Sequence, residues 1–572
     1  MRKNSQSKNG AKYFSILKGV KLPWILIILC VASSIGMMLG ELNVASLTAG
    51  IIDSSQNAIN AKMLINYIGF TALTAILSIL SNYFTRKMEE TITLRVRVKL
   101  WLKIMRLPTR YYDEDNGDEL VTRITSDATA PSSLFSVAVS FIVCAVTTVK
   151  AFISLYSTNV MLANYSLIII PLTFVICIVY GKISFKLGVY STTTMAGSIG
   201  YLAERVRNFR LIKSAVAQKV ESKKGDETFK EMYKAEFLNW LLVACYQLCS
   251  GIYSIMFIVI VFVIGGQLIP TGELTIGDLT GFYMITGILG LQLLQFFMNI
   301  GSVSGTFGTM KKIAEISDSE SEKQDGKDVP EICSDIEFDN VSFGYSDERD
   351  VLKNLSVKIP MGKVTAIIGG NGAGKSTLFK MITRLYEPKS GEIKFGEDNI
   401  DEYNVTQWRD RFSFVFQRNP LIGGTVRENI TYGLDREVTD EELIDVAKKA
   451  NCYDCIMAKP NGFDEDVGLG GSNFSGGQGQ CISIARAMLR NSDYLLLDEA
   501  TSNLDVVSEA AVTRAMDNLM KNKTTLMIAH NFAATRNADY IIVMKDGTVE
   551  AAGTPDELMK TNEYYQMFCK TL

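Results

Sequence analysis

The sequence has little histidine, little cysteine and no large excess of charge, and each shortage excludes a class of protein. A single histidine among 572 residues excludes any mechanism that needs two within one chain. Ten cysteines are too few for a disulfide scaffold. The 58 basic and 61 acidic residues leave a net charge of −3, which argues against a broadly basic nucleic-acid binder. Apolar residues, in contrast, make up 47% of the chain, too many for a disordered protein and unusually many for a soluble enzyme.

The one Cys-x-x-Cys pair, Cys452 and Cys455, has no second pair to complete a zinc site. A structural zinc needs four ligands, and the only histidine, His530, lies about 75 residues beyond Cys455. We therefore expect no metal at these cysteines. Cys30 and Cys144 lie inside apolar runs, where we expect them to serve packing.

Six long apolar stretches in the first 305 residues predict a membrane domain. Each exceeds the roughly 20 residues that a helix needs to cross the hydrocarbon core. Buried helices of a large soluble protein would need far more polar residues around them, so we disfavour that alternative. The stretches cover residues 22–48, 64–84, 131–157, 160–181, 238–269 and 278–305.

The distribution of basic residues predicts the orientation of these spans. The segments 85–130 and 182–236 are dense in Lys and Arg, whereas 50–63 contains only Lys62 and 268–280 contains no basic residue. Because basic loops stay in the cytoplasm, both termini are expected there, in a multi-pass protein of the inner membrane. Residues 12–18 could form a short amphipathic lead-in along the inner interface. The amino-terminal segment is basic throughout, with Arg2, Lys3, Lys8, Lys12, Lys18 and Lys21.

The basic segments are predicted to be helical. From Ser81 to Leu107 there is no Gly or Pro, and charged residues recur among apolar ones at helical spacing. Spans two and three, and spans four and five, should therefore continue into the cytoplasm as helices. At 1.5 Å per residue, 25 further residues would reach roughly 37 Å below the membrane. A cytoplasmic domain is expected at that depth.

Polar residues inside the spans are candidates for the substrate cavity. Glu41 and Lys150 each lie about 20 residues into a span, so an ion pair between them is geometrically possible. Snorkelling of each to the outer interface is the alternative. Gln292, Gln295 and Asn299 share one helical face, which indicates either a cavity lining or hydrogen bonds between helices.

Near Ser317 the composition changes to an acidic, polar linker that ends at Pro330. Beyond it, short β-rich runs alternate with helical segments, the pattern of an α/β domain. We predict a lead-in at 1–20, a transmembrane domain at 21–310, a linker at 311–334 and a second domain at 335–572.

A strand-like run from Lys363 to Ile368 leads directly into GGNGAGKST and a helical segment. This G-x-x-x-x-G-K-[ST] spacing between strand and helix is a phosphate-binding loop. Its glycines let backbone N–H groups converge on phosphates, Lys375 neutralises the β and γ oxygens, and the Ser376 hydroxyl can bind Mg²⁺. The predicted nucleotide-binding residues are Gly369, Asn371, Gly372, Ala373, Gly374, Lys375, Ser376 and Thr377.

A second apolar strand, YLLLDE, ends in Asp498 and Glu499. Asp498 would emerge beside the phosphate-binding loop, where it can hold Mg²⁺ through water. Glu499 can orient or deprotonate the attacking water. An acidic pair after an apolar strand is often a plain strand end, but its position downstream of the loop favours catalysis.

The segment FSGGQ, from Phe474 to Gln478, lies between these motifs. The order of loop, SGGQ and acidic strand resembles that of ATP-binding cassette (ABC) transporters of the exporter-type fold, over nearly the whole chain. The fold implied is an all-α six-helix transmembrane domain followed by an α/β P-loop cassette. A half-transporter of this kind implies ATP and Mg²⁺ as cofactors.

The resemblance implies a role for each matching residue. Tyr345 resembles the aromatic residue that stacks on adenine, and Gln417 resembles the glutamine that senses the γ-phosphate and Mg²⁺. Asp505 resembles the aspartate that couples the two sites, and His530 resembles the switch histidine. The signature that meets the ATP of the opposite subunit corresponds to Ser475, Gly476, Gly477 and Gln478.

Two membrane-domain segments resemble coupling-helix regions, Arg106 to Asp127 and Tyr201 to Ser214. The chain also departs from the family pattern. Phe474 replaces the usual leucine, basic residues are missing at Gly479 and Cys481, and Asn-Phe follows His530 instead of Arg-Leu. Leu469 stands where a glutamate is common, so a charged contact between cassette and coupling helix is in doubt.

The resemblance implies ATP-driven efflux of a peptide, lipid or amphiphilic small molecule by alternating access. Two copies would pair head to tail with ATP between them; a homodimer is simplest, and a heterodimer is the alternative. An importer of a metal chelate and an ATP-gated channel or regulator are the competing functions. Intact Glu499 and His530 disfavour a gate, which can dispense with turnover. The other partners implied are the bilayer and a substrate, with no nucleic acid.

Overall fold

The computed structural model describes residues 15–54, 61–114, 117–167, 169–346, 348–417, 421–498, 506–529, 532–535 and 537–570. The chain forms two compact units. The helical unit comprises Met1–Arg106 and Asp115–Glu320, and the cassette comprises Leu107–Glu114 and Ser321–Leu572.

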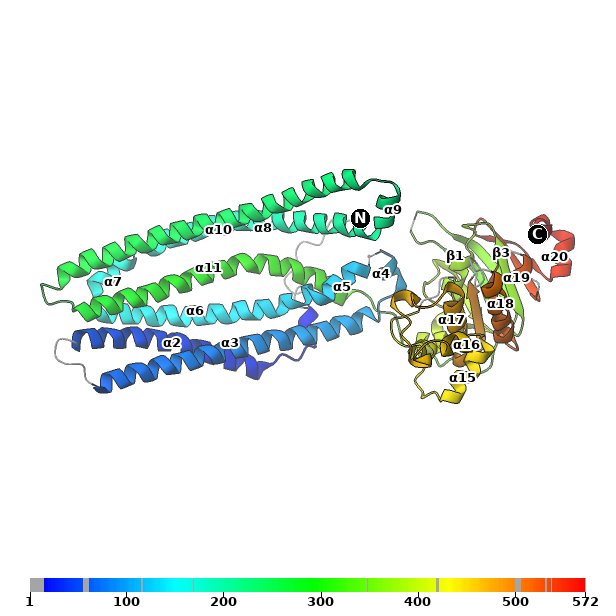
Figure 1. The fold of residues 1–572 in the computed structure, drawn as a ribbon, viewed down its shortest axis with the longest axis horizontal. Helices are drawn as coiled ribbons and strands as arrows, with labels where there is room; N and C mark the ends of the chain where they lie inside the picture. The colour runs from blue at the N-terminus through cyan, green and yellow to red at the C-terminus, as the bar shows by residue number, and fades with distance from the viewer. Residues whose placement is uncertain are drawn as a thin grey trace. The chain divides into compact units, whose positions relative to one another are not determined.

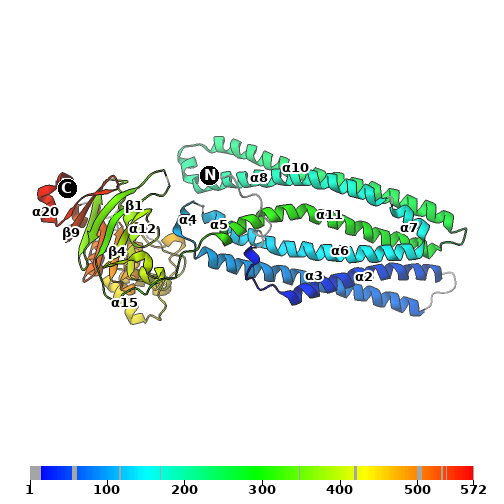
Figure 2. The ribbon, with the colours of Figure 1, turned by 180° about the vertical axis from the view of Figure 1, so that it is seen from behind.

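The helical unit consists of long helices that run side by side (Figures 1 and 2). Helix α2 packs against α3, α6 and α11, and α8 packs against α10. The elements are η1 Ser15–Leu17, α2 Trp24–Ser54, α3 Ala61–Ile104, α5 Gly117–Thr125, η3 Asp127–Thr129, α6 Ala130–Thr158, α7 Val160–Leu167, α8 Ile169–Arg207, α9 Phe209–Ser214, α10 Gln218–Leu268 and α11 Ile276–Asp318. Helix α4, Thr109–Glu114, belongs to the cassette unit.

The predicted helical continuations are confirmed for spans two, four and five, whereas the helix of span three, α6, begins only at Ala130, after the short elements α5 and η3. Helix α3 runs without interruption for 44 residues to Ile104, and α10 runs for 51 residues. At 1.5 Å per residue, α10 is about 77 Å long, far more than the roughly 30 Å of a bilayer's hydrocarbon core. These helices therefore extend well beyond any membrane they cross. The predicted domain boundary at residue 310 lies inside α11.

Three helical segments among the described residues are long and apolar enough to cross a membrane: α2, α3 and the stretch Glu119–Thr158. Helix α10 adds a shorter apolar segment, Ile255–Leu268. The spans predicted at 160–181 and 278–305 fall on α7, α8 and α11.

One carboxylate joins the C-terminal end of α2 to the N-terminal end of α11. Asp53 accepts hydrogen bonds from the Gly277 amide at 2.8 Å and from the Thr275 hydroxyl at 2.6 Å. The helices approach so closely here that a Cβ at Gly277 would lie 2.1 Å from the Ala49 carbonyl oxygen. A negative charge at a helix N-terminus is favourable, so this clasp stabilises the α2–α11 contact.

The cassette is built on two sheets. A six-stranded sheet has the order β10-β9-β3-β8-β7-β6, parallel except for β10, and an antiparallel sheet has the order β2-β1-β4-β5. The strands are β1 Ile336–Phe343, β2 Leu352–Ile359, β3 Val364–Gly369, β4 Ser390–Phe395, β5 Asp398–Asn399, β6 Phe412–Val415, β7 Tyr494–Asp498, β8 Thr524–Ile528, β9 Tyr540–Lys545 and β10 Thr548–Gly553. The helices are α12 Lys375–Ile382, η4 Ile400–Glu402, α13 Val405–Asp410, α14 Val426–Ile430, α15 Asp440–Lys449, α16 Tyr453–Met457, η5 Gly462–Asp464, η6 Leu469–Gly471, α17 Gly476–Arg490, α18 Val506–Met520, α19 Phe532–Thr535, α20 Pro555–Thr561 and α21 Glu563–Lys570.

Strand β3 is buried on both faces. Its neighbouring residues Ile367 and Ile368 are fully buried, each in a different apolar cluster of the cassette. This burial explains why the strand reads as a continuous apolar run in the sequence, as central parallel strands do. The strand delivers the phosphate-binding loop at its C-terminal end.

Candidate nucleotide site

The loop between β3 and α12 has a backbone that only glycine adopts easily. Gly372 has φ +81° and Gly374 has φ +100°, both in the left-handed region. A Cβ at Gly374 would also lie 2.7 Å from Leu352 Cδ2. The loop ends at the N-terminus of α12, whose free N–H groups and positive dipole end favour a phosphate.

The polar side chains of the loop are held in different ways. Lys375 is 7% exposed, and its ammonium group donates to the carbonyl oxygens of Gly369 at 2.8 Å and Gly370 at 3.1 Å. The next residue, Ser376, is exposed, whereas Thr377 is buried. The Lys375 ammonium group is therefore held against the loop backbone, whereas the Ser376 side chain is accessible to an ion or a phosphate.

A cavity of about 730 Å³ opens beside this loop. Tyr345, predicted to stack on adenine, lines it and is 42% exposed. The Tyr345 hydroxyl shares a hydrogen bond with Thr377 at 3.2 Å, and the Lys380 ammonium lies 5.0 Å from the centre of its ring. These contacts hold the ring while leaving part of it open to the cavity. The lining consists of Tyr345, Arg349, Asp350, Val351, Lys353, Asn371, Gly372, Ala373, Gly374, Lys375, Ser376, Thr377 and Asp546.

Four charged lining residues were not predicted from the sequence: Arg349, Asp350, Lys353 and Asp546. Asp546 follows β9, which pairs with β3, so the sheet brings it to the loop across more than 170 residues of sequence. Only the charged run that extends into the start of β2 could have pointed to the other three. It resembles any solvated loop.

The predicted magnesium and catalytic residues follow the ends of neighbouring strands. Asp498 ends β7 and pairs in register with Ile528 of β8, which pairs with Ile367 of β3. Since these strands are parallel, Asp498 lies at the same edge of the sheet as the phosphate-binding loop. Gln417 follows β6 at this edge and is exposed. Glu499, Asp505 and His530 lie outside the described residues.

The predicted signature forms the N-terminus of α17. Ser475 is its N-cap, and Ser475 and Gln478 exchange hydrogen bonds between side chain and backbone at 2.9 and 3.3 Å. A Cβ at Gly477 would lie 2.5 Å from Ser508 Cβ, so this position requires glycine. With Gly476, the segment presents a second helix N-terminus suited to an anion. No signature residue lines the cavity beside the phosphate-binding loop within the described chain.

Three of the departures from the family pattern, Phe474, Gly479 and Cys481, are buried in the cassette, whereas Leu469 is exposed. Phe474 is 8% exposed, with the Lys459 ammonium 4.9 Å from the centre of its ring. Gly479 is buried, and Cys481 lies in the apolar core, where burial raises its pKa to about 12. Basic side chains at these two positions would therefore be buried. Leu469 is 91% exposed on a glycine-rich turn, so no packing among the described residues requires it.

The predicted coupling regions contain short helices at the ends of long ones. The first holds α4 and α5, and the second holds α9 between α8 and α10. Around α9 the chain exposes large apolar side chains: Val206 is 74% exposed, Leu211 67% and Val216 79%. Such a surface is expected of a protein contact site.

The polar stripe on α11 serves helix packing at two of its three positions. Gln292 donates from Nε2 to Met38 Sδ at 2.9 Å, and Asn299 donates from Nδ2 to Ser140 Oγ at 2.7 Å. Gln295 is exposed. Hydrogen bonds between helices therefore explain Gln292 and Asn299 and leave Gln295 available to a cavity.

Glu41 is half-buried on α2, and Lys150 is exposed on α6. Among the ion pairs of the described residues, none joins these two side chains. The pair that the sequence allows is not formed in this structure. Separate positions for the two charges are compatible with snorkelling.

The helices are longer than the thickness of a membrane, and the same chain carries a cassette with a phosphate-binding loop. This combination defines an ATP-dependent membrane transporter. A family model described as the ABC transporter transmembrane region matches residues 24–302, and a second, described as ABC transporter, matches residues 352–502. The chain belongs to the ABC transporter family. It is an ATPase coupled to transport and is embedded in a membrane.

Two relatives illustrate the similarity. The "Multidrug resistance ABC transporter ATP-binding and permease protein" of Lactococcus lactis subsp. cremoris is 29% identical over 98% of this chain and 96% of its own length. The "ATP-dependent lipid A-core flippase" of Escherichia coli is 30% identical over 88% of this chain and 87% of its own length. Both alignments include the helical unit and the cassette.

Proposed function

We propose that this protein exports a lipid, a peptide or an amphiphilic small molecule across the cytoplasmic membrane, with both termini in the cytoplasm. The observation that carries the proposal is the alignment, along both units, with relatives named for multidrug resistance and for flipping a lipid. The exposed Gln295 and the charged Glu41 and Lys150 are the candidate substrate contacts. The direction of transport is tested by comparing ATP-driven flux in inside-out vesicles and in right-side-out proteoliposomes, with a fluorescent amphiphile as the probe.

The working unit we propose is a dimer, with a homodimer as the simplest form. Two separate helix N-termini, at α12 and α17, each suit an anion, and the cavity at α12 contains no described residue from the signature. A second copy would supply the missing half of each site. The exposed apolar residues around α9 provide a surface for such a contact.

The residues at the end of the sheet fit a nucleoside triphosphate with Mg²⁺. Loop amides and Lys375 would bind the phosphates, while Ser376, Gln417 and Asp498 would hold Mg²⁺, which neutralises phosphate charge when bound. Glu499 would orient the attacking water, and His530 would contact the γ-phosphate. ATP binding would favour the closed dimer and turn the cavity outward, and hydrolysis would release it.

Two substitutions test this mechanism. Glu499→Gln should abolish hydrolysis and leave a stable ATP-bound dimer, detectable by size-exclusion chromatography with light scattering. His530→Ala should strongly reduce hydrolysis with little loss of ATP binding. Normal turnover in either variant would remove that residue from its proposed role, and a monomer in the presence of Mg²⁺ and a non-hydrolysable analogue would contradict the dimer.

A further inference from the structure

The segment after α11 is not a free linker but is docked along the cassette. Helix α11 ends at Asp318, and residues 321–330 then run alongside the backbone that connects η4 to α13. The Lys327 amide donates to the Glu402 carbonyl at 2.7 Å, and the Asn404 amide donates to the Lys327 carbonyl at 2.9 Å. A Cβ at Gly326 would lie 2.4 Å from the Tyr403 carbonyl carbon, so the two backbones are in direct contact.

Arg409, in the last turn of α13, makes the most extensive side-chain contact with this segment. Its Nη1 and Nη2 atoms donate to the two carboxylate oxygens of Glu322, both at 2.8 Å. Both side chains are largely buried, with 27% of Arg409 and 19% of Glu322 exposed. A paired, two-bond geometry of this kind is the strong form of an arginine–carboxylate contact.

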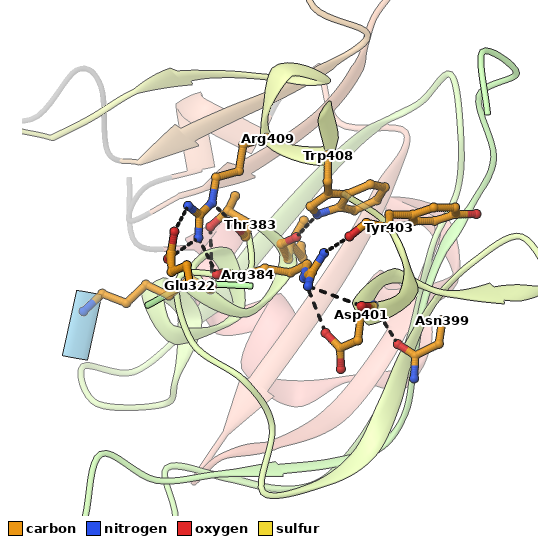
Figure 3. Close-up of polar contacts among 10 residues, drawn as sticks. Glu322, Thr383, Arg384, Asn399, Asp401, Tyr403, Trp408 and Arg409 are labelled. Atoms are coloured by element: carbon orange, nitrogen blue, oxygen red, sulfur yellow. Dashed lines mark hydrogen bonds and ion pairs between the residues drawn. The ribbon is translucent and has the colours of Figure 1, made fainter. Parts of the chain in front are cut away.

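The same guanidinium also holds the far end of the helix that begins at the phosphate-binding loop. Arg409 Nε donates to the Thr383 carbonyl at 3.0 Å, and Nη2 donates to the Arg384 carbonyl at 2.6 Å. These carbonyls lie at the C-terminal end of α12, where a positive charge is favourable. Figure 3 shows Arg409 between Glu322 on one side and Thr383 and Arg384 on the other.

Neighbouring contacts fix this end of α12 further. The Trp408 indole donates to the Ile382 carbonyl at 2.7 Å, and the Arg384 side chain donates to the Tyr403 carbonyl at 2.7 Å. Arg384 itself has φ +52°, the left-handed conformation that ends the helix. Because α12 is a rigid helix of eight residues, a shift of its C-terminal end moves the phosphate-binding loop at its N-terminal end.

We propose that Arg409 is a positioning residue of the nucleotide site. It joins the docked segment 321–330 to α12, the helix that begins at the phosphate-binding loop, so that docking of the segment and nucleotide binding strengthen each other. Thermodynamic coupling of this kind is reciprocal: the factor by which docking improves nucleotide affinity equals the factor by which nucleotide improves docking. The segment follows α11 directly in the chain, so the stretch that leaves the membrane domain is held by the hydrogen bonds of Arg409 to the helix that carries the phosphate-binding loop. The proposal rests on nucleotide binding and not on the direction of transport, so each can fail without the other.

The test compares variants of the full-length protein in lipid nanodiscs, with Mg²⁺ and a non-hydrolysable ATP analogue as the probe. Hydrogen exchange is measured at the Lys327 and Val329 amides, which donate to Glu402 and to the Gln407 side chain. In the wild-type protein, the analogue should slow exchange at both amides about fivefold. In Glu322→Ala, this dependence should disappear, and affinity for the analogue should fall by a similar factor.

Two further variants make the result specific. Arg409→Lys keeps the charge but cannot make the paired contact, and it should behave like Glu322→Ala. Asp410→Ala removes an ion pair that the residue next to Arg409 makes with Arg490 at 2.8 Å. This ion pair touches neither the segment nor α12, so the variant should behave like wild type. If Glu322→Ala raises exchange equally with and without the analogue and leaves affinity unchanged, the contact is merely structural and the proposal is wrong. The absence of any nucleotide effect in the wild-type protein would also overturn it.

Discussion

The two units of this chain use their polar groups differently. In the cassette, single side chains join segments that are far apart in sequence: the Tyr494 hydroxyl donates to the Ser334 carbonyl at 2.5 Å, across 160 residues. In the helical unit, many hydroxyls donate to a carbonyl one turn back in their own helix, as Thr48 does to Val44 at 2.8 Å. Polar contacts between helices, such as Ser34 to Ser81, are mostly single bonds.

This difference follows from the surroundings of each unit. The cassette has a buried core and irregular loops, so its backbone groups need partners supplied from elsewhere in the chain. A membrane helix satisfies its own backbone, and hydrogen bonds between such helices contribute little. Substitutions should therefore have large, local effects in the cassette and small effects in the helical unit.

The largest effect is expected at the phosphate-binding loop. Lys375→Ala removes the buried ammonium group, and a hydrogen bond to a charged group is worth about 1.5–3 kcal/mol, so ATP affinity should fall about 10- to 100-fold. Titration with a fluorescent nucleotide measures the change, together with loss of phosphate release. Lys358→Ala is the control, since that lysine pairs with Asp335 at 2.8 Å and does not line the cavity. Equal losses in the two variants would mean that Lys375 acts through general charge only.

The loop shows how much of the site could be predicted from the sequence. Lys375, Ser376 and the glycines are adjacent in a motif whose spacing implies its geometry. The contribution of Asp546 was not predictable, because the sheet brings it to the loop from a distant segment, and Arg349 lies in a charged run that resembles any solvated loop. Tyr345 lines the cavity, and its role with adenine stays a prediction.

The long helices and the α/β class were also predictable, because apolar periodicity and length depend only on local sequence. The docked segment 321–330 was not. Its acidic composition indicates a solvated linker, whereas much of its docking uses backbone groups of Lys327 and Asn404, which leave no pattern in the sequence. The partners of Gln292 and Asn299 were likewise open until the neighbouring helices were known.

A smaller effect is expected at the clasp between α2 and α11. Asp53→Ala removes two hydrogen bonds between helices of the membrane domain, each worth about 0.6 kcal/mol, so the total loss of about 1 kcal/mol should lower the thermal midpoint of the helical unit by about 2–4 °C. Tryptophan fluorescence or differential scanning calorimetry in detergent measures the shift. Asp226→Ala, which breaks an exposed pair with Lys230 on α10, should shift it by less than about 1 °C. If Asp53→Ala lowers the thermal midpoint no more than Asp226→Ala does, Asp53 does not stabilise the contact between α2 and α11.

The smallest effects distinguish packing from transport on α11. Asn299→Leu removes the hydrogen bond to Ser140, which in membrane helices is worth about 0.6 kcal/mol, so it should slightly lower the thermal midpoint. Gln295→Leu should leave that midpoint unchanged, because its side chain is exposed, but should alter the stimulation of ATPase activity by a fluorescent amphiphile. Basal ATPase activity serves as the control in both variants. If Gln295→Leu changes basal and stimulated rates equally, Gln295 does not line the transport route, and the role of the stripe is confined to the interhelical hydrogen bonds of Gln292 and Asn299.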